Sequence, residues 1–131
     1  MLDTDTSSYV IRGKAPVLDS NLRRVPMEAL CISAVTRAEL RFGVHRLLPH
    51  AHRLAAAVDG FILGVRTLAW DEAAADAFAA VRSALEAKGN PIGVLDMMIA
   101  SHAVAVSAVL VTNNTRHFRQ VEGLRVENWA R

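Results

Sequence analysis

Three acidic residues in this sequence occupy places where polar side chains could converge on one site. Asp3 follows Leu2 at the start of the chain, and Glu39 and Asp96 lie near the starts of two later helical segments. Carboxylates that hold Mg²⁺ or Mn²⁺ supply the activated water and the charge compensation that hydrolysis of a phosphodiester requires. Because these hard cations prefer oxygen ligands, Asn, Thr and water complete a suitable ligand set. The acids belong to separate segments, so a metal site requires a fold that brings them together.

Each acid also has an ordinary structural explanation. Glu39 lies three residues after Thr36, which is the spacing of a capping box at a helix start. Asp96 precedes an apolar helical run as an N-cap would, and Asp5 suits a turn. Asp3 is harder to explain by capping, because it directly follows a strand at the start of the chain. Capping is therefore the alternative to metal binding for Glu39 and Asp96, and a turn is the alternative for Asp3 and Asp5.

Short apolar runs alternate with segments of helical spacing, and these elements must position the acids. We expect strands at the first residues and at 29–33, 66–69, 108–112 and 124–128, and helices at 6–12, 16–24, 35–48, 51–61, 71–88 and 95–106. This alternation is typical of a parallel sheet with helices on both faces. Ligands of such sheets bind beyond the carboxyl ends of the strands. Besides the acids, the polar residues at those ends are Ser33, Thr112, Asn113 and Asn114.

Length and composition limit the classes of protein that fit this pattern. The 131 residues suit a single domain, and 52% of them are hydrophobic, which argues against disorder. No apolar run reaches the ~18 residues of a membrane span, and the first residues lack the features of a secretion signal. The single cysteine, Cys31, excludes an internal disulfide and fits a reducing compartment. We therefore expect one cytoplasmic α/β domain over residues 1–131 that does not enter a membrane.

Other chemistries find weaker support in the residues. The sequence contains no glycine-rich dinucleotide or P-loop motif. His45, His50 and His52 are not at a convincing zinc spacing with any acid or with Cys31. His102 is expected on a helix face rather than as a ligand. The net charge of +2 decides nothing about nucleic acid by itself.

Four stretches of the chain, in order and spacing, resemble the motifs of the PIN-domain family. They are Leu2-Asp3-Thr4 and the stretches 32–40, 92–103 and 110–118. The stretch 121–129 is also similar to the end of that family. Within it, the chain resembles VapC-type ribonuclease toxins of bacterial toxin–antitoxin pairs, and the likeness runs from residue 1 to residue 129.

The resemblance implies a three-layer α/β/α sandwich around a central, mostly parallel sheet, and a metal-dependent endoribonuclease. Asp3, Glu39 and Asp96 would be the catalytic acids. Asp3 and Asp96, with Glu39 and Asp5 as further candidates, would hold Mg²⁺ or Mn²⁺ and position the attacking water. The implied partners are an RNA substrate, a second copy of the chain and a VapB-like antitoxin, whose helical tail would block the acidic site.

The chain departs from the family at one position of the implied site. Relatives often carry a further acid where this sequence has Asn114, so Thr112 and Asn114 are expected as supporting polar residues. Neutral Asn114 adds no charge, which argues against a second fully bound metal. Asp5 stands where relatives commonly show Asn. Two residues from Asp3 along an extended segment, it would face the same side and restore the missing charge.

Basic residues near the acids are candidates for contacts with RNA phosphates. Arg37 and Arg41 flank Glu39, and Arg116 follows Thr112. Further candidates are Arg12, Lys14, Arg23, Arg24 and Arg119. The alternatives are a solvated basic face or a face that docks the antitoxin.

Two other functions stay open at this point. The segment Asp3-Thr4-Asp5-Thr6-Ser7 comes near the nucleophile motif of haloacid-dehalogenase-type phosphatases, but a late metal motif and a lysine partner are missing. A catalytically inactive PIN-like binding module is the other alternative, and the retention of all three acids argues against it.

The helix pair over 35–61 carries more large apolar residues than one buried face needs. These residues are Phe42, Leu47, Leu48, Leu54 and Phe61. They are candidates for a dimer or antitoxin contact, and the alternative is that they line the core.

Overall fold

The computed structural model describes residues 1–90 and 92–131. The helices are α1 (Thr4–Arg12), α2 (Pro16–Leu22), the 3₁₀ turn η1 (Met27–Ala29), α3 (Ala34–Leu47), α4 (His52–Gly64), α5 (Glu72–Ala87), α6 (Val94–Ala105) and α7 (Thr115–Phe118). The strands are β1 (Cys31–Ser33), β2 (Arg66–Leu68), β3 (Val109–Val111) and β4 (Arg125–Glu127). This succession confirms the expected α/β class.

The strands form one parallel arrangement that Leu2 joins at its centre. Strand β1 pairs with β2, and β3 pairs with β4, both in parallel. Leu2 makes parallel bridges to Ile32 on one side and to Val111 on the other. The strand expected at the start of the chain is therefore reduced to this bridging residue, and the order across the sheet is β2, β1, Leu2, β3 and β4.

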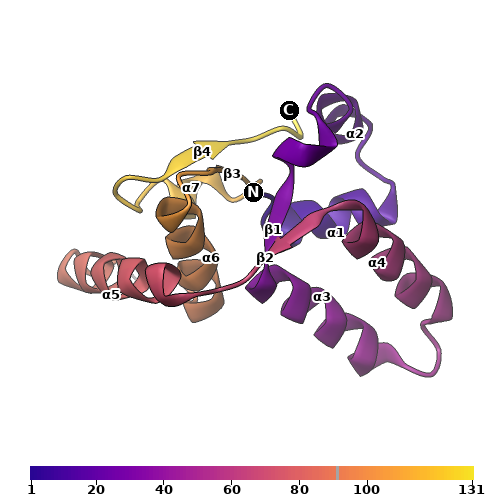
Figure 1. Cartoon of the computed structure of the whole chain (residues 1–131), viewed down its shortest axis with the longest axis horizontal. Helices are drawn as coiled ribbons and strands as arrows, with labels where there is room; N and C mark the ends of the chain where they lie inside the picture. Colours follow the sequence, from indigo (N-terminus) through magenta and orange to yellow (C-terminus); the bar gives the residue numbers. More distant parts are fainter. Residues whose placement is uncertain (91) are drawn as a thin grey trace.

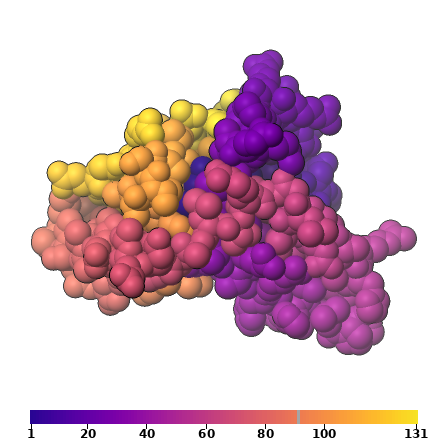
Figure 2. All heavy atoms as spheres, in the orientation of Figure 1, coloured from indigo at the N-terminus to yellow at the C-terminus, as the bar shows by residue number. Residues whose placement is uncertain are grey.

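Alternate side chains of the central residues point to opposite faces of the sheet, as strand geometry requires. Leu2, Ile32 and Val111 form one buried cluster, against which Phe61 of α4 packs. The preceding residues, including Cys31 and Leu110, belong to a second cluster with α5 and α6. Helices therefore cover both faces, and Figure 1 shows α5 and α6 on one side of the sheet and α3 and α4 on the other. In the space-filling view of Figure 2, the atoms of α3 and α4 form the lower right of the molecule. The expected three-layer α/β/α sandwich with a parallel sheet is confirmed.

Local signals in the sequence set several helix ends. Gly13 follows α1 in the left-handed conformation (φ 64°), and its N–H donates to the carbonyl of Val10. Asp71 caps α5 through a bond from the backbone N–H of Ala74 at 3.1 Å. No helix in the part of the chain that the structure describes is long and apolar enough to cross a membrane.

Most expected boundaries differ from the structure by one residue, and four differ by two or three, including the end of α2 at Leu22 and the end of α4 at Gly64. Helix α1 begins at Thr4 rather than Thr6, because Asp3 is its N-cap. The strand expected from residue 29 begins at Cys31, because the 3₁₀ turn η1 occupies the preceding residues. The short helix α7 was not expected at all, since four residues are too few to show a helical period.

Candidate functional site

The carboxylate of Asp3 lies at the carboxyl end of the central Leu2 bridge and is held by two hydrogen bonds. It is buried, with 4% of the residue exposed. Its Oδ1 accepts a bond from the backbone N–H of Thr6 at 2.8 Å, and its Oδ2 accepts one from the hydroxyl of Thr112. The expectation that Asp3 is hard to explain by capping was therefore wrong, because Asp3 caps α1.

Glu39 lies on α3 and reaches toward the start of α1. Its Oε1 accepts a hydrogen bond from the hydroxyl of Thr4 at 2.7 Å. The N-cap of α3 is Ser33, whose Oγ accepts a bond from the backbone N–H of Val35. Thr36 is therefore inside the helix, and the capping-box alternative for Glu39 was wrong.

Asp96 is the third residue of α6 and is not its N-cap. Gly93 occupies the cap position, and no side chain caps this helix. Burial raises the pKa of Asp96, and the charges of Glu39, Asp3 and Asp5 raise it further, while His117 opposes them. Such mutual influence requires that these carboxylates share one region of the molecule, although they come from α1, α3 and α6.

Asp3 is subject to the same opposing effects. Burial raises its pKa above the ordinary value and Asp5 adds to this, whereas the hydrogen bonds from Thr112 and Thr6 lower it. The site therefore gathers negative charge in a partly desolvated place, which is the environment that a divalent cation would stabilise.

The donors fit a hard cation that keeps part of its water shell. Asp3, Glu39 and Asp96 offer only oxygen atoms, the ligands that Mg²⁺ and Mn²⁺ prefer. Within residues 1–90 and 92–131, no three His, Cys, Asp or Glu side chains are gathered closely enough to hold an ion by themselves. Mg²⁺ is commonly bound by one or two carboxylates together with waters and substrate phosphates, so this arrangement suits it.

Thr112 and Asn114 border the acids from the loop after β3. The backbone N–H of Asn114 donates to the hydroxyl of Thr112 at 2.9 Å. The side-chain amide of Asn114 is hydrogen-bonded to Nδ1 of His117 at 3.0 Å. Thr112 thus links Asp3 to the loop that carries Asn114 and His117.

Asp5 is near the site for a reason other than the one expected. It is exposed in the first turn of α1, so the segment after Asp3 is helical and not extended. Its charge nevertheless raises the pKa of both Asp3 and Asp96. The helical turn, rather than strand alternation, brings it close.

The hydrogen bonds of several supporting residues were missed from the sequence. The hydroxyls of Thr4 and Thr36 lie 3.2 Å apart beside Glu39. Behind them, Nδ1 of buried His102 is 2.8 Å from the hydroxyl of Ser33, which ties α6 to the start of α3. Burial lowers the pKa of His102, so its ring stays neutral at physiological pH. Their partners are far away in sequence, and no spacing signal could have revealed them.

The three arginines nearest to the acids in the sequence, among those proposed for RNA contact, differ in their surroundings. Arg37 and Arg116 are exposed on α3 and α7. Arg41 forms an ion pair with Asp59 of α4, so its guanidinium is already engaged. Arg37 and Arg116 therefore stay the better candidates.

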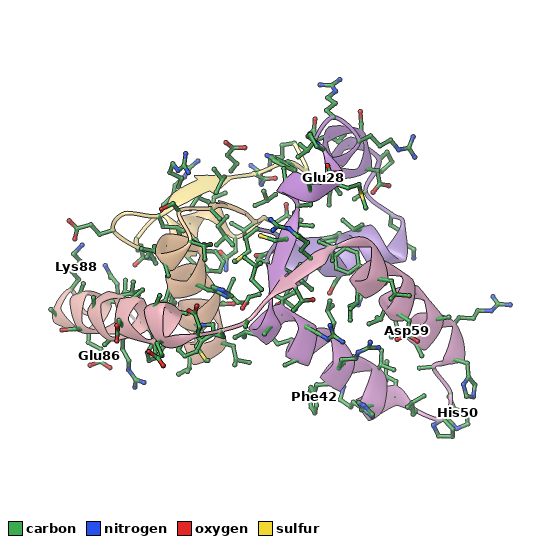
Figure 3. All side chains as sticks on the ribbon, viewed as in Figure 1. Glu28, Phe42, His50, Asp59, Glu86 and Lys88 are labelled. Carbon is green, nitrogen blue, oxygen red and sulfur yellow. The ribbon has the colours of Figure 1, made fainter. Side chains whose placement is uncertain are left out.

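The apolar residues expected at a partner contact divide into two groups. Phe42, Leu47 and Leu48 are exposed on the α3–α4 hairpin, and Figure 3 shows Phe42 pointing away from it. Leu54 and Phe61 pack instead against buried clusters of the protein's own core. Only the first group is available to another chain.

The comparisons with known proteins agree with this architecture. The family model described as PIN domain matches residues 1–124. The protein named tRNA(fMet)-specific endonuclease VapC from Salmonella typhimurium is 37% identical over 130 residues, which cover 99% of this chain and 97% of that protein. Ribonuclease VapC2 from Rickettsia felis is 32% identical over 130 residues, which cover 98% and 96%.

Solved structures show the same fold. The DNA-bound VapBC of Salmonella typhimurium superposes with a TM-score of 0.89 at 37% identity and covers 98% of this chain and 96% of that one. The Rickettsia felis VapBC2 bound to a promoter DNA fragment has the same TM-score at 32% identity and covers 98% and 97%. Because the family model and these relatives extend over nearly the whole chain, the chain belongs to the PIN domain family and, within it, to the VapC ribonucleases.

Proposed function

We propose that this chain is a divalent-metal-dependent endoribonuclease that cuts initiator transfer RNA and acts as the toxin of a toxin–antitoxin pair. The observation that supports the catalytic part is that Glu39 is hydrogen-bonded to Thr4, the neighbour of Asp3, and that the charges of both acids act on Asp96 of a third element. The substrate is suggested by the name of the Salmonella typhimurium relative, tRNA(fMet)-specific endonuclease VapC.

In this proposal, Asp3, Glu39 and Asp96 would hold Mg²⁺ or Mn²⁺ together with water molecules and the substrate phosphate, with Asp5 adding charge. The bound ion supplies an activated water and compensates the charge on the phosphoryl oxygens. Asp3 is preorganised, because bonds from Thr6 and Thr112 fix both of its oxygens. The Thr4 hydroxyl holds Glu39 in the same way. Deprotonation of Asp96 is favoured when a cation offsets the neighbouring negative charges, so metal affinity should increase with pH.

The proposed partners are an antitoxin and a second copy of the chain. Both solved relatives described above are VapBC structures. Exposed Phe42, Leu47 and Leu48 give this chain apolar surface that a partner would cover.

The test is cleavage of initiator transfer RNA by purified protein free of antitoxin, with Mg²⁺, with Mn²⁺ and with EDTA. Asp96→Asn should abolish cleavage, whereas Asp76→Asn, which removes an exposed acid of α5, should not. Metal-dependent fragments from wild type and from the control variant would support the proposal. If the folded wild-type protein cuts neither this RNA nor total cellular RNA in any metal, the catalytically inactive PIN-like module becomes the better description.

Asp5 has its own test. Because its charge raises the pKa of Asp3 and Asp96, Asp5→Asn should weaken metal binding, measured by calorimetry with Mn²⁺. Unchanged metal affinity and unchanged cleavage would show that Asp5 is only a residue of the first helical turn.

A further inference from the structure

A hollow of about 190 Å³ between α1, α3 and α4 adjoins the candidate site. Thr4 and Glu39, which are hydrogen-bonded to each other, belong to its lining. So do Arg12, the last residue of α1, and Arg46, in the last turn of α3. The hollow therefore extends from an acidic part that it shares with the candidate site to a part lined by two arginines.

The length of this hollow follows from its helices. Arg12 is two turns beyond Thr4 on α1, and Arg46 is two turns beyond Glu39 on α3. At 1.5 Å per residue, each pair is separated by ~10–12 Å along the helix axis. The phosphates of one strand advance about 3.4 Å each along the axis of a duplex, and they are farther apart along an extended single strand, so this length covers about two nucleotides.

The surface between the two ends is apolar and open. Leu40, Leu54 and Val58 line it and belong to the cluster that packs α3 against α4. Gly43 also lines it, and a Cβ atom at that position would meet no other atom within 4 Å. An apolar floor of this kind suits the face of a base or a ribose.

The two arginines are free of carboxylate partners. Both are exposed, and neither is in a salt bridge among the described residues, whereas Arg41 and Arg82 are. The guanidinium of Arg46 lies 5.9 Å from the ring centroid of Phe42, which leaves its donors free. An uncommitted guanidinium is well suited to bind a phosphate group.

We propose that this hollow binds the RNA strand beside the cleaved phosphodiester, with Arg12 and Arg46 on its phosphates and its sugar or base over Leu40 and Gly43. This inference rests on the proposed function and assigns a subsite to it. The arginines also lie where a positive charge favours a helix C-terminus, and that role alone would make them matter for stability but not for RNA.

The first test compares two double variants that lose the same charge. The variant Arg12→Gln/Arg46→Gln alters the hollow. The control variant Arg82→Gln/Lys88→Gln alters α5 and its C-cap, where Figure 3 labels Lys88. Binding of fluorescent poly(U) is measured by anisotropy in EDTA over a series of salt concentrations. The first variant should bind on the order of tenfold more weakly. Its slope of log affinity against log salt should fall by about 1.4, since each phosphate contact on a single strand contributes about 0.7.

The second test fills the hollow without removing charge. Gly43→Met places a side chain in the open space, and it should keep or raise thermal stability because Gly is a poor helix former. Gly60→Met in α4 is the matched control, because a Cβ atom there also meets nothing within 4 Å. We expect Gly43→Met alone to weaken poly(U) binding and to raise KM for RNA cleavage with kcat unchanged.

The outcomes separate this inference from the proposed function. If wild type cleaves RNA but both double variants bind poly(U) equally well, or Gly43→Met binds like wild type, the subsite is refuted and the nuclease stands. If wild type cleaves nothing while the binding differences are found, the nuclease fails and the hollow is supported as an RNA-binding surface. Unchanged poly(U) affinity together with weakened antitoxin binding assigns the hollow to a protein and overturns the inference.

Discussion

Replacing Thr112 with Val removes one hydroxyl that serves two parts of the candidate site. The buried hydroxyl donates to Oδ2 of Asp3 and accepts from the backbone N–H of Asn114. A hydrogen bond to a charged group contributes about 1.5–3 kcal/mol, and an unpaired buried N–H costs about 1–3 kcal/mol. Asn114 is only half-buried, so water replaces part of its bond. We expect Thr112→Val to lower the free energy of unfolding by about 2–4 kcal/mol, or the melting temperature by on the order of 10 °C.

The same substitution should change the pH dependence of cleavage. The bond from Thr112 lowers the pKa of Asp3 and thereby opposes the effect of burial. Without it the pKa of Asp3 increases further, and a higher pH is needed before Asp3 becomes charged and can bind metal. The pH–rate profile of RNA cleavage and the pH dependence of Mn²⁺ affinity should both shift to higher pH.

Thr112→Ser is the matched control, because it keeps the hydroxyl and loses only a methyl group. It should retain the wild-type pH profile and lose about 1 kcal/mol of stability. The profiles are measured at one fixed, subsaturating metal concentration for all variants, with melting followed by circular dichroism in EDTA. An unshifted profile for Thr112→Val, or the same shift in both variants, would refute the reasoning that the hydroxyl tunes Asp3.

Three further outcomes follow from the structure. Because burial raises the pKa of Asp3, the folded state favours the protonated carboxyl. The stability that this group contributes is therefore fully present below pH ~4 and is lost as the pH rises through its folded-state pKa. Asp3→Asn, which can still cap α1, should therefore raise the melting temperature of the metal-free protein at neutral pH, with no gain below pH ~4, while cleavage is lost. Ser33→Ala removes the cap of α3 and the bond to His102, and should lower the free energy of unfolding in urea by about 1–3 kcal/mol. Gly60→Ala within α4 should raise that free energy by about 0.5–1 kcal/mol, whereas Gly13→Ala, at φ 64°, should lower it by about 1–2 kcal/mol.

The long helices and the buried strands were predictable because each leaves a local pattern. The run expected at 108–112 contains β3, and the helix expected at 71–88 contains α5, whose cap and terminal glycine are local signals. The turn η1 and helix α7 left no such pattern, because three or four residues do not complete a period. The strand at the start of the chain was foreseen, but its reduction to Leu2 depends on pairing with segments far away in the sequence.

The candidate acids were predictable as residue types at strand and helix ends, whereas their surroundings were not. Glu39 is held by Thr4, 35 residues earlier, and Asp3 is held by Thr112, 109 residues later. Neither pair has a spacing that a periodic pattern could disclose. The place of Asp5 was foreseen for the wrong reason, since α1 begins at Thr4, two residues earlier than an extended segment through Asp5 would need.

Capping and metal binding need not exclude each other at Asp3. An ionised carboxylate has about four acceptor positions on its two oxygens. The N–H of Thr6 uses one position on Oδ1, and the hydroxyl of Thr112 uses one on Oδ2, so each oxygen keeps one position for a cation. Because both bonds fix the rotamer, the cap reduces the conformational entropy that a flexible ligand would lose on binding metal. Asp3, the N-cap of α1, is thereby also the best-positioned carboxylate of the candidate site.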